Sequence, residues 1–233
     1  MTILYPKRTR TKLANKQKII RVAINLFARK GYQATTQEEI AQDANLHLQT
    51  LYRHFRSKEE LAIAAAELSV SDCNERFKNN FSHANTFEIW RKWIKSSSSF
   101  LLSLGIGEEK RDRLCSASSL MNDNYLLIIY SGYEDLLTHY IAQDFCMDVK
   151  IDRLPRLVAG MLWNGNEAAM KRCAGKDTES NNLHNVNHVL AESLAVVDDI
   201  EAVFKGHIKL QRRSHELFPD THSSSQFGPI GEC

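Results

Sequence analysis

The feature that most constrains the fold is a run of short helical segments between residues 15 and 62, each with a clear start or stop. In the first segment, Ile19, Leu26 and Phe27 recur at helical spacing, which places their side chains on one face. Gly31 follows directly, and glycine just after the last periodic residue is a helix stop signal. The pattern predicts an amphipathic helix that ends at residue 30 or 31.

The next two segments are shorter and lie close together. Thr36 precedes Glu39 by three residues, which is the spacing of a capping box and predicts the start of a second helix. That helix is expected to end near Asn45, because asparagine tolerates the left-handed conformation that a tight turn needs. A third short helix is expected from about residue 47 to residue 55.

A fourth, longer helix is expected to begin at Ser57, which forms a second capping box with Glu60. Leu51 and Phe55 are four residues apart and share one face of the third helix, so we assign them, together with Leu46, to the core. Helix, tight turn, helix and break within about thirty residues is the spacing of a helix-turn-helix.

The rest of the chain also reads as helical. The 233 residues contain only ten glycines and four prolines, and no segment alternates strictly between apolar and polar residues. Helical patterns extend over residues 86–104, 124–145, 152–173 and 184–208, and a polar tail without periodicity follows Gln211. The stretch from Tyr125 to Tyr130 is apolar nearly all round and predicts a buried inner helix. The predicted fold class is all-α.

Charge divides the chain into two unequal parts. Residues 1–61 contain 12 lysines and arginines and 5 acidic residues, a net charge of +7, whereas residues 62–233 contain 18 and 23, a net charge of −5. A basic end joined to an acidic remainder is typical of a protein that binds a polyanion with one domain. Lys7, Arg8, Arg10 and Lys12 add a basic arm before the first helix, either an ordinary disordered start or a segment that follows a DNA groove.

Cysteine use and hydropathy predict a cytoplasmic protein. The five cysteines are widely spaced and include no CxxC pair, which favours free thiols in a reducing compartment; they are Cys73, Cys115, Cys146, Cys173 and Cys233. No apolar stretch is long enough to span a membrane, and the N-terminus has no apolar signal core, so we expect neither membrane insertion nor export.

Three motifs, "GYQATTQEEIA", "TLYRHF" and "SKEEL", resemble the N-terminal signature of the TetR (tetracycline-repressor) family of bacterial transcription regulators. The resemblance covers about residues 15–62 and implies a helix-turn-helix DNA-binding domain there. It further implies a C-terminal helical domain over residues 63–211 that dimerises and encloses a small-molecule pocket. Residues 1–14 would be the basic arm, and residues 212–233 a disordered tail.

The third helix is predicted to enter the major groove of DNA, where base edges offer hydrogen-bond donors, acceptors and thymine methyl groups. Gln49 suits an adenine edge, Thr50 and His47 can donate or accept, and Leu48 either contacts a thymine methyl or leans into the core. The resemblance implies that Tyr52 and His54 hold backbone phosphates. The starts of the second and fourth helices favour phosphate too, through Thr36, Gln37 and Lys58.

This sequence departs from the usual family pattern at three positions in the motif. Asn45 stands where glycine is common, His47 replaces the usual serine, and Gln49 replaces a small residue. A bulky side chain at position 49 must either contact a base or hold the backbone away from DNA. Arg53 and Arg56, on the same outer face, are either DNA contacts or solvated charges.

The predicted pocket residues are the large apolar and aromatic side chains of the C-terminal domain, which serve either a ligand site or an ordinary core. They are Trp90, Trp93, Phe100, Met121, Tyr125, Ile128 and Trp163. Gly160 and Gly165 cost about 1 kcal/mol each in mid-helix, which indicates close helix packing either between subunits or within one.

The sequence favours a regulator over an enzyme. His184 and His188 are four apart, but no carboxylate or cysteine stands beside them at a metal-ligand spacing, and no catalytic motif is present, so we expect no metal, cofactor or enzymatic activity. The predicted function is a homodimeric repressor on palindromic double-stranded DNA, released by a small apolar or amphipathic effector. The alternative is an effector-free DNA-bound dimer whose C-terminal domain docks a protein partner.

Overall fold

The computed structural model describes residues 6–103, 124–176 and 181–209, and every regular element in these ranges is a helix. The α-helices are α1 (Pro6–Lys30), α2 (Gln37–Asp43), α3 (Leu48–His54), α4 (Lys58–Asn80), α5 (Thr86–Ser103), α7 (Asn124–Phe145), α8 (Leu154–Cys173) and α9 (Val186–Phe204). A short 3-10 helix, Lys205–His207, follows α9. The all-α prediction is confirmed. The polar tail predicted after Gln211 lies outside the described residues.

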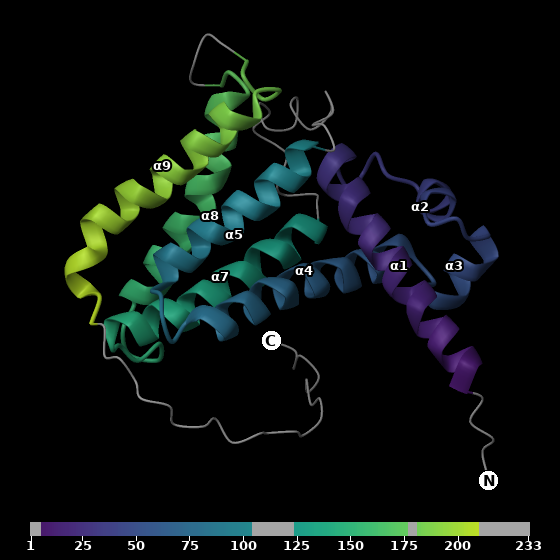
Figure 1. The fold of residues 1–233 in the computed structure, drawn as a ribbon, viewed down its shortest axis with the longest axis horizontal. Coiled ribbons are helices and arrows are strands. Elements are labelled where there is room, and N and C mark those ends of the chain that lie inside the picture. Colours follow the sequence, from purple (N-terminus) through teal and green to yellow (C-terminus); the bar gives the residue numbers. More distant parts are fainter. Residues whose placement is uncertain (1–5, 104–123, 177–180, 210–233) are drawn as a thin grey trace, which may run out of the picture.

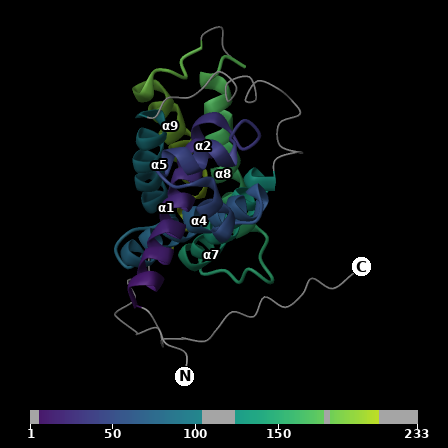
Figure 2. The same ribbon diagram turned by 90° about the vertical axis from the view of Figure 1, so that its right-hand side faces the viewer.

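The helices form two groups that share α4 (Figure 1). Helices α1, α2 and α3 gather at one end of the molecule, and α5, α7, α8 and α9 pack together at the other. Helix α4 packs against α1 near its start and against α7 along the rest of its length. Figure 2 looks onto the α1–α3 end, with α5, α8 and α9 behind it.

The local start and stop signals of the N-terminal group are confirmed. Gly31 has a φ of 92° and Asn45 a φ of 48°, so both adopt the left-handed conformation at helix ends. The capping box of α2 is complete, because Glu39 N donates to Thr36 Oγ1 (3.2 Å) and Thr36 N donates to Glu39 Oε2 (3.0 Å). These contacts join residues at most three positions apart, which is why the sequence alone predicts them.

The second capping box is only half formed. Glu60 N donates to Ser57 Oγ (3.1 Å), as predicted, but the Glu60 carboxylate accepts from Arg56 N (2.7 Å) instead of from the Ser57 amide. Arg56 directly precedes the cap and offers its N–H in the turn between α3 and α4.

The basic arm predicted before the first helix is wrong as a structural description, because α1 begins at Pro6 and includes Lys7, Arg8, Arg10 and Lys12. Proline suits the first turn of a helix, and neither glycine nor proline occurs again until Gly31, so nothing in the segment interrupts the helix.

The start of α7 is less buried than its composition predicted. Of the side chains described between Tyr125 and Tyr130, only Ile129 is buried, and Leu127 is 48% exposed. Helix α7 packs between α4 and α8, so part of its surface faces away from both. The prediction of an inner helix buried on all sides is therefore wrong for this stretch.

Two glycines mark close helix contacts within the chain. A Cβ on Gly165 of α8 would lie 2.4 Å from Val196 Cγ1 of α9, and a Cβ on Gly132 of α7 would lie 2.7 Å from Val70 Cγ2 of α4. A Cβ on Gly160 would meet no atom within 4 Å. The two α8 glycines therefore differ. Gly165 allows close packing within the subunit, whereas Gly160 faces open space.

Replacing Gly165 by alanine should destabilise the protein by up to about 2 kcal/mol. Overpacking against a β-branched side chain typically costs about 1–3 kcal/mol, and higher helix propensity offsets about 1 kcal/mol. Urea unfolding at fixed protein concentration measures the change. The double variant Gly165→Ala/Val196→Ala should recover part of the loss, and a loss equal to the sum of the single variants would show that this contact is not its cause.

Candidate DNA-binding site

Helix α3 presents a polar outer face while its inner face is anchored in the core. Gln49, Tyr52 and Arg53 are exposed, with Tyr52 at 44%, whereas Leu51 is fully buried and Phe55, the C-cap, is nearly so. The predicted core role of Leu51 and Phe55 is confirmed. A seven-residue helix held by two such side chains can present its outer groups rigidly.

The remaining residues predicted on α3 differ in exposure. His47 is the N-cap of α3 but makes no capping bond with its side chain, so its exposed imidazole remains on the outer surface. Leu48 is half-buried and packs against the core, which favours the structural alternative for this residue. Thr50 is also half-buried.

Helix α2 packs against α3 at the same end of the molecule (Figure 1). Thr36 is exposed and caps the helix, so its hydroxyl oxygen is occupied while its proton stays available to donate. Gln37 is half-buried, and its amide nitrogen has no hydrogen-bond partner among the described residues. Both residues stand where free backbone N–H groups favour an anion.

Helix α1 contributes positive charge to the far end of α3. His54, the last residue of α3, is half-buried, and its pKa is lowered by burial and then by the positive charges of Lys12, Arg53 and Lys16. The Lys16 ammonium lies 5.6 Å from the centre of the Phe55 ring. The basic residues at the N-terminus therefore flank α3 from the first helix.

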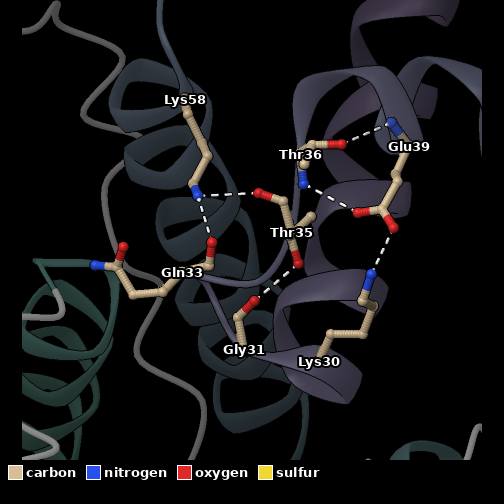
Figure 3. Close-up of polar contacts among 7 residues, drawn as sticks. All are labelled: Lys30, Gly31, Gln33, Thr35, Thr36, Glu39 and Lys58. Carbon is tan, nitrogen blue, oxygen red and sulfur yellow. Dashed lines mark hydrogen bonds and ion pairs between the residues drawn. The ribbon is translucent and has the colours of Figure 1, made fainter. Parts of the chain in front are cut away.

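The loop between α1 and α2 is held by hydrogen bonds from within and by Lys58 from α4 (Figure 3). Thr35 Oγ1 donates to Gly31 O (2.8 Å), and Lys30 Nζ pairs with Glu39 Oε1 (2.5 Å). Lys58 Nζ donates to the carbonyl oxygens of Thr35 (2.9 Å) and Gln33 (3.3 Å). The sequence pattern predicted that Lys58 faces phosphate and gave no sign of these contacts with the loop.

Tyr32 also contacts the start of α4, and the sequence pattern did not predict a role for it. Lys58 Nζ lies 4.3 Å from the centre of the Tyr32 ring, and the Tyr32 hydroxyl donates to Glu59 Oε1 (3.1 Å). The only sign of this role in the sequence was an aromatic residue directly after Gly31, where α1 ends. Its partners Lys58 and Glu59 lie more than twenty residues away, so no local pattern indicates the contact.

A second cluster joins α5, α7 and α8 and contains several predicted pocket residues. The ring of Tyr133 stacks on Trp163 (centroids 4.8 Å apart, planes at 15°) and lies 5.8 Å from Trp90 and 6.2 Å from Trp93. Trp90 is almost fully buried, and Ile128 packs against the same core. The side chains of Phe100, Met121 and Tyr125 lie outside the described residues. Tyr133 was not predicted, although its place on α7 made it visible as an aromatic at helical spacing.

His184 and His188 do not share a helix face. Helix α9 begins at Val186, and Asn185 caps it by accepting from His188 N (3.1 Å), so His184 precedes the helix. Over the described ranges, no group of three or more histidine, cysteine or acidic side chains could hold a metal ion. None of the helices in these ranges is both long and apolar enough to cross a membrane.

The family described as "Bacterial regulatory proteins, tetR family" matches residues 19–65, from the middle of α1 into α4. The uncharacterized HTH-type transcriptional regulator YerO of Bacillus subtilis is 41% identical over 64 residues, 28% of this chain and 22% of that protein. IcaR of Staphylococcus aureus, an HTH-type negative transcriptional regulator of the biofilm operon, is 42% identical over 64 residues, 28% and 32% of the two chains. Each match spans less than a third of the relative's own length.

The likeness of the whole chain to solved structures is in the fold. A TetR-family transcriptional regulator from Streptomyces coelicolor superposes with a TM-score of 0.56 at 16% identity, covering 83% of this chain and 82% of that one. Residues 19–65 of this chain therefore match the TetR family of bacterial regulatory proteins, and the helices that the structure describes have the fold of a solved TetR-family regulator.

Proposed function

We propose that this protein is a dimeric transcription repressor that binds double-stranded DNA and is released from a palindromic operator by a small apolar or amphipathic molecule. The observation that carries the proposal is α3, a short helix with buried anchors and an exposed face of amide, phenol and guanidinium groups. Such a face matches the donors and acceptors of the major groove. A DNA-bound regulator acts in the cytoplasm of a bacterial cell.

Within this proposal, the exposed residues divide into two roles. Gln49, His47 and Thr50 contact base edges, with Gln49 suited to adenine, and Leu48 supplies an apolar edge only as far as its core packing allows. Tyr52, His54, Thr36 and Gln37 contact backbone phosphates. Phosphate contacts are the same for every base sequence, so these residues fix the position of the protein on DNA without reading its sequence. The net charge of +7 over residues 1–61 favours the approach of DNA.

The dimer in this proposal forms through the outward face of α8. Leu157 (62% exposed) and Met161 (44%) are large apolar residues on that face, and Asn164 and Ala168 continue it at helical spacing. Gly160 lies beside them in open space, which leaves room for a second chain to approach closely. Exposed apolar side chains gathered on one helix face favour burial in an interface.

The effector would act on the aromatic cluster around Tyr133, because this cluster contacts α4. Tyr133 donates its hydroxyl to Ser69 O of α4 (3.2 Å), and the Arg76 guanidinium of α4 lies 5.5 Å from the centre of the Trp93 ring. A ligand that binds better when α4 is displaced would shift the population toward that state and away from DNA. The alternative is an effector-free dimer whose C-terminal domain docks a protein. The name of IcaR, a negative regulator, supports repression over activation.

Selection of bound fragments from the source genome tests the proposal, and two variants sharpen it. The wild-type protein should enrich a palindromic motif. Gln49→Ala should relax one base position in each half-site and weaken binding to the preferred site by about 1–3 kcal/mol per half-site. Tyr52→Phe should weaken all sequences alike. Failure of the wild type to enrich any motif would contradict the function, and an unchanged motif with Gln49→Ala would contradict the role of Gln49 alone.

DNA affinity should rise as the pH falls below 7. Burial and neighbouring cations lower the pKa of His54, so the imidazole is neutral in the free protein at pH 7. A DNA phosphate beside the imidazole would raise the pKa of His54 in the complex. At a pH between the pKa of the free protein and that of the complex, DNA binding therefore takes up a proton, and the affinity increases up to about tenfold for each pH unit that the pH falls. Fluorescence anisotropy from pH 8 to 5.5 measures this. His54→Asn should flatten the profile, whereas His139→Asn, exposed on α7, should not.

Replacing both Leu157 and Met161 by glutamate should convert the dimer to a monomer, because like charges would face each other across the interface. Sedimentation velocity at micromolar concentration should show the smaller species, and affinity for a palindromic site should fall at least tenfold. Ile151→Glu, an exposed apolar residue in the turn before α8, serves as the control and should remain dimeric. A wild-type monomer, free and on DNA, would refute the dimer.

A further inference from the structure

The first residue of α4 reaches back to the loop that leads into α2. Lys58 Nζ donates to Thr35 O (2.9 Å) and Gln33 O (3.3 Å), and it lies 4.3 Å from the centre of the Tyr32 ring (Figure 3). The ammonium has three N–H donors, and two of them point at loop carbonyls. Lys58 is half-buried in this position, so the group is directed into the protein.

The neighbouring residue of α4 holds the same loop. Glu59 Oε1 accepts from the Tyr32 hydroxyl (3.1 Å), and the Tyr32 ring in turn packs edge-on against Phe27 of α1, with centroids 5.4 Å apart. Tyr32 is nearly buried. Two consecutive side chains at the start of α4 thus attach to a loop more than twenty residues earlier in the chain.

This loop determines where α2 begins. Thr35 is almost fully buried, and its neighbour Thr36 is the N-cap of α2. The Lys30–Glu39 ion pair then joins the end of α1 to the first turn of α2. Any movement of the loop therefore also moves Thr36, the N-cap of α2, and Gln37, its first residue, both of which belong to the proposed DNA-binding surface.

We propose that Lys58 is a positioning residue for DNA binding, which ties the first turn of α4 to the α1–α2 loop and sets the N-terminus of α2, and that it does not neutralise a DNA phosphate. The inference rests on the proposed DNA-binding function. A phosphate would have to draw the ammonium away from two carbonyls and an aromatic ring, contacts that favour the bound position.

The same contact gives α4 a direct route to the DNA-binding surface. Displacement of the first turn of α4 moves the ammonium relative to Gln33 and Thr35, so either the contact breaks or the loop follows. Because both acceptors are backbone carbonyls, side-chain changes in the loop cannot remove them. Position 58 is therefore the place to test the contact.

The first test uses the protein without DNA. Lys58→Met keeps an unbranched apolar side chain over Tyr32 but removes the charge and all three donors. Amide hydrogen exchange should become roughly tenfold faster in residues 31–40, while α3 and the C-terminal helices exchange as in the wild type. Unchanged exchange in residues 31–40 would overturn the proposal, as would acceleration spread evenly over all helices, which indicates a general loss of stability.

The second test measures the salt dependence of DNA affinity on a selected site between 50 and 200 mM KCl. Lys58→Met should bind roughly tenfold more weakly at every salt concentration, with the slope of log K against log salt unchanged. Because the dimer carries Lys58 twice, removing two lysines from phosphates would instead make the slope shallower by about 1.8, about 0.9 for each subunit. That shallower slope, or unchanged affinity, would overturn the proposal. If the wild type binds no DNA, the proposed function fails, and the exchange measurement still tests the contact.

The matched control is Arg53→Met, which removes a positive charge from exposed α3 without touching the loop. Its exchange in residues 31–40 should equal that of the wild type, so a general effect of lost charge would be detected. Should Lys58→Met fail to fold, Lys58→Leu takes its place, because it also removes the charge and all three donors while keeping an apolar side chain. The same outcomes then support or overturn the proposal.

Discussion

The burial of α4 between two groups of helices is the interaction on which the rest of the structure depends. Near its start, Leu61 and Ala65 are fully buried, and α4 packs against α1 of the N-terminal group. Further along, Phe77 stacks on Tyr140 of α7 (centroids 4.7 Å apart), and the Tyr140 hydroxyl donates to Asn74 Oδ1 (3.0 Å). Burying a large apolar side chain stabilises a fold by roughly 1.5–3 kcal/mol, so α4 is anchored at both ends.

This anchoring means that the position of α3 is set indirectly. Helix α3 is short, and an isolated helix of seven residues is not stable in water. Its geometry comes from Leu51 and Phe55 in the core, from the turn at Asn45 and from the attachment of the following helix. By contrast, the Arg21–Asp72 ion pair between α1 and α4 (3.7 Å) joins two largely exposed side chains and contributes little. Buried apolar side chains and helix caps therefore hold α3 in position.

Much of the candidate site was predictable because its determinants are local. The cap at Thr36 and the left-handed turn at Asn45 depend on residues a few positions apart, and the alternation of Leu51 and Phe55 with polar groups depends on helical periodicity. The direction of the Lys58 side chain was not predictable in this way. Whether its ammonium faces solvent or loop carbonyls depends on how α4 packs beside a loop distant in sequence, and a residue type does not specify that.

The sequence by itself determined the helical fold class, the succession of the N-terminal helices and the identity of the groups on α3, because propensity, capping and periodicity act over one or two helical turns. Only the tertiary structure decided that Leu127 is exposed, that Gly165 packs against Val196 while Gly160 faces open space, and that Tyr133 joins three tryptophans. Each of these outcomes depends on which helix lies opposite a given face. That choice is made by packing between segments far apart in the chain, which no local pattern encodes.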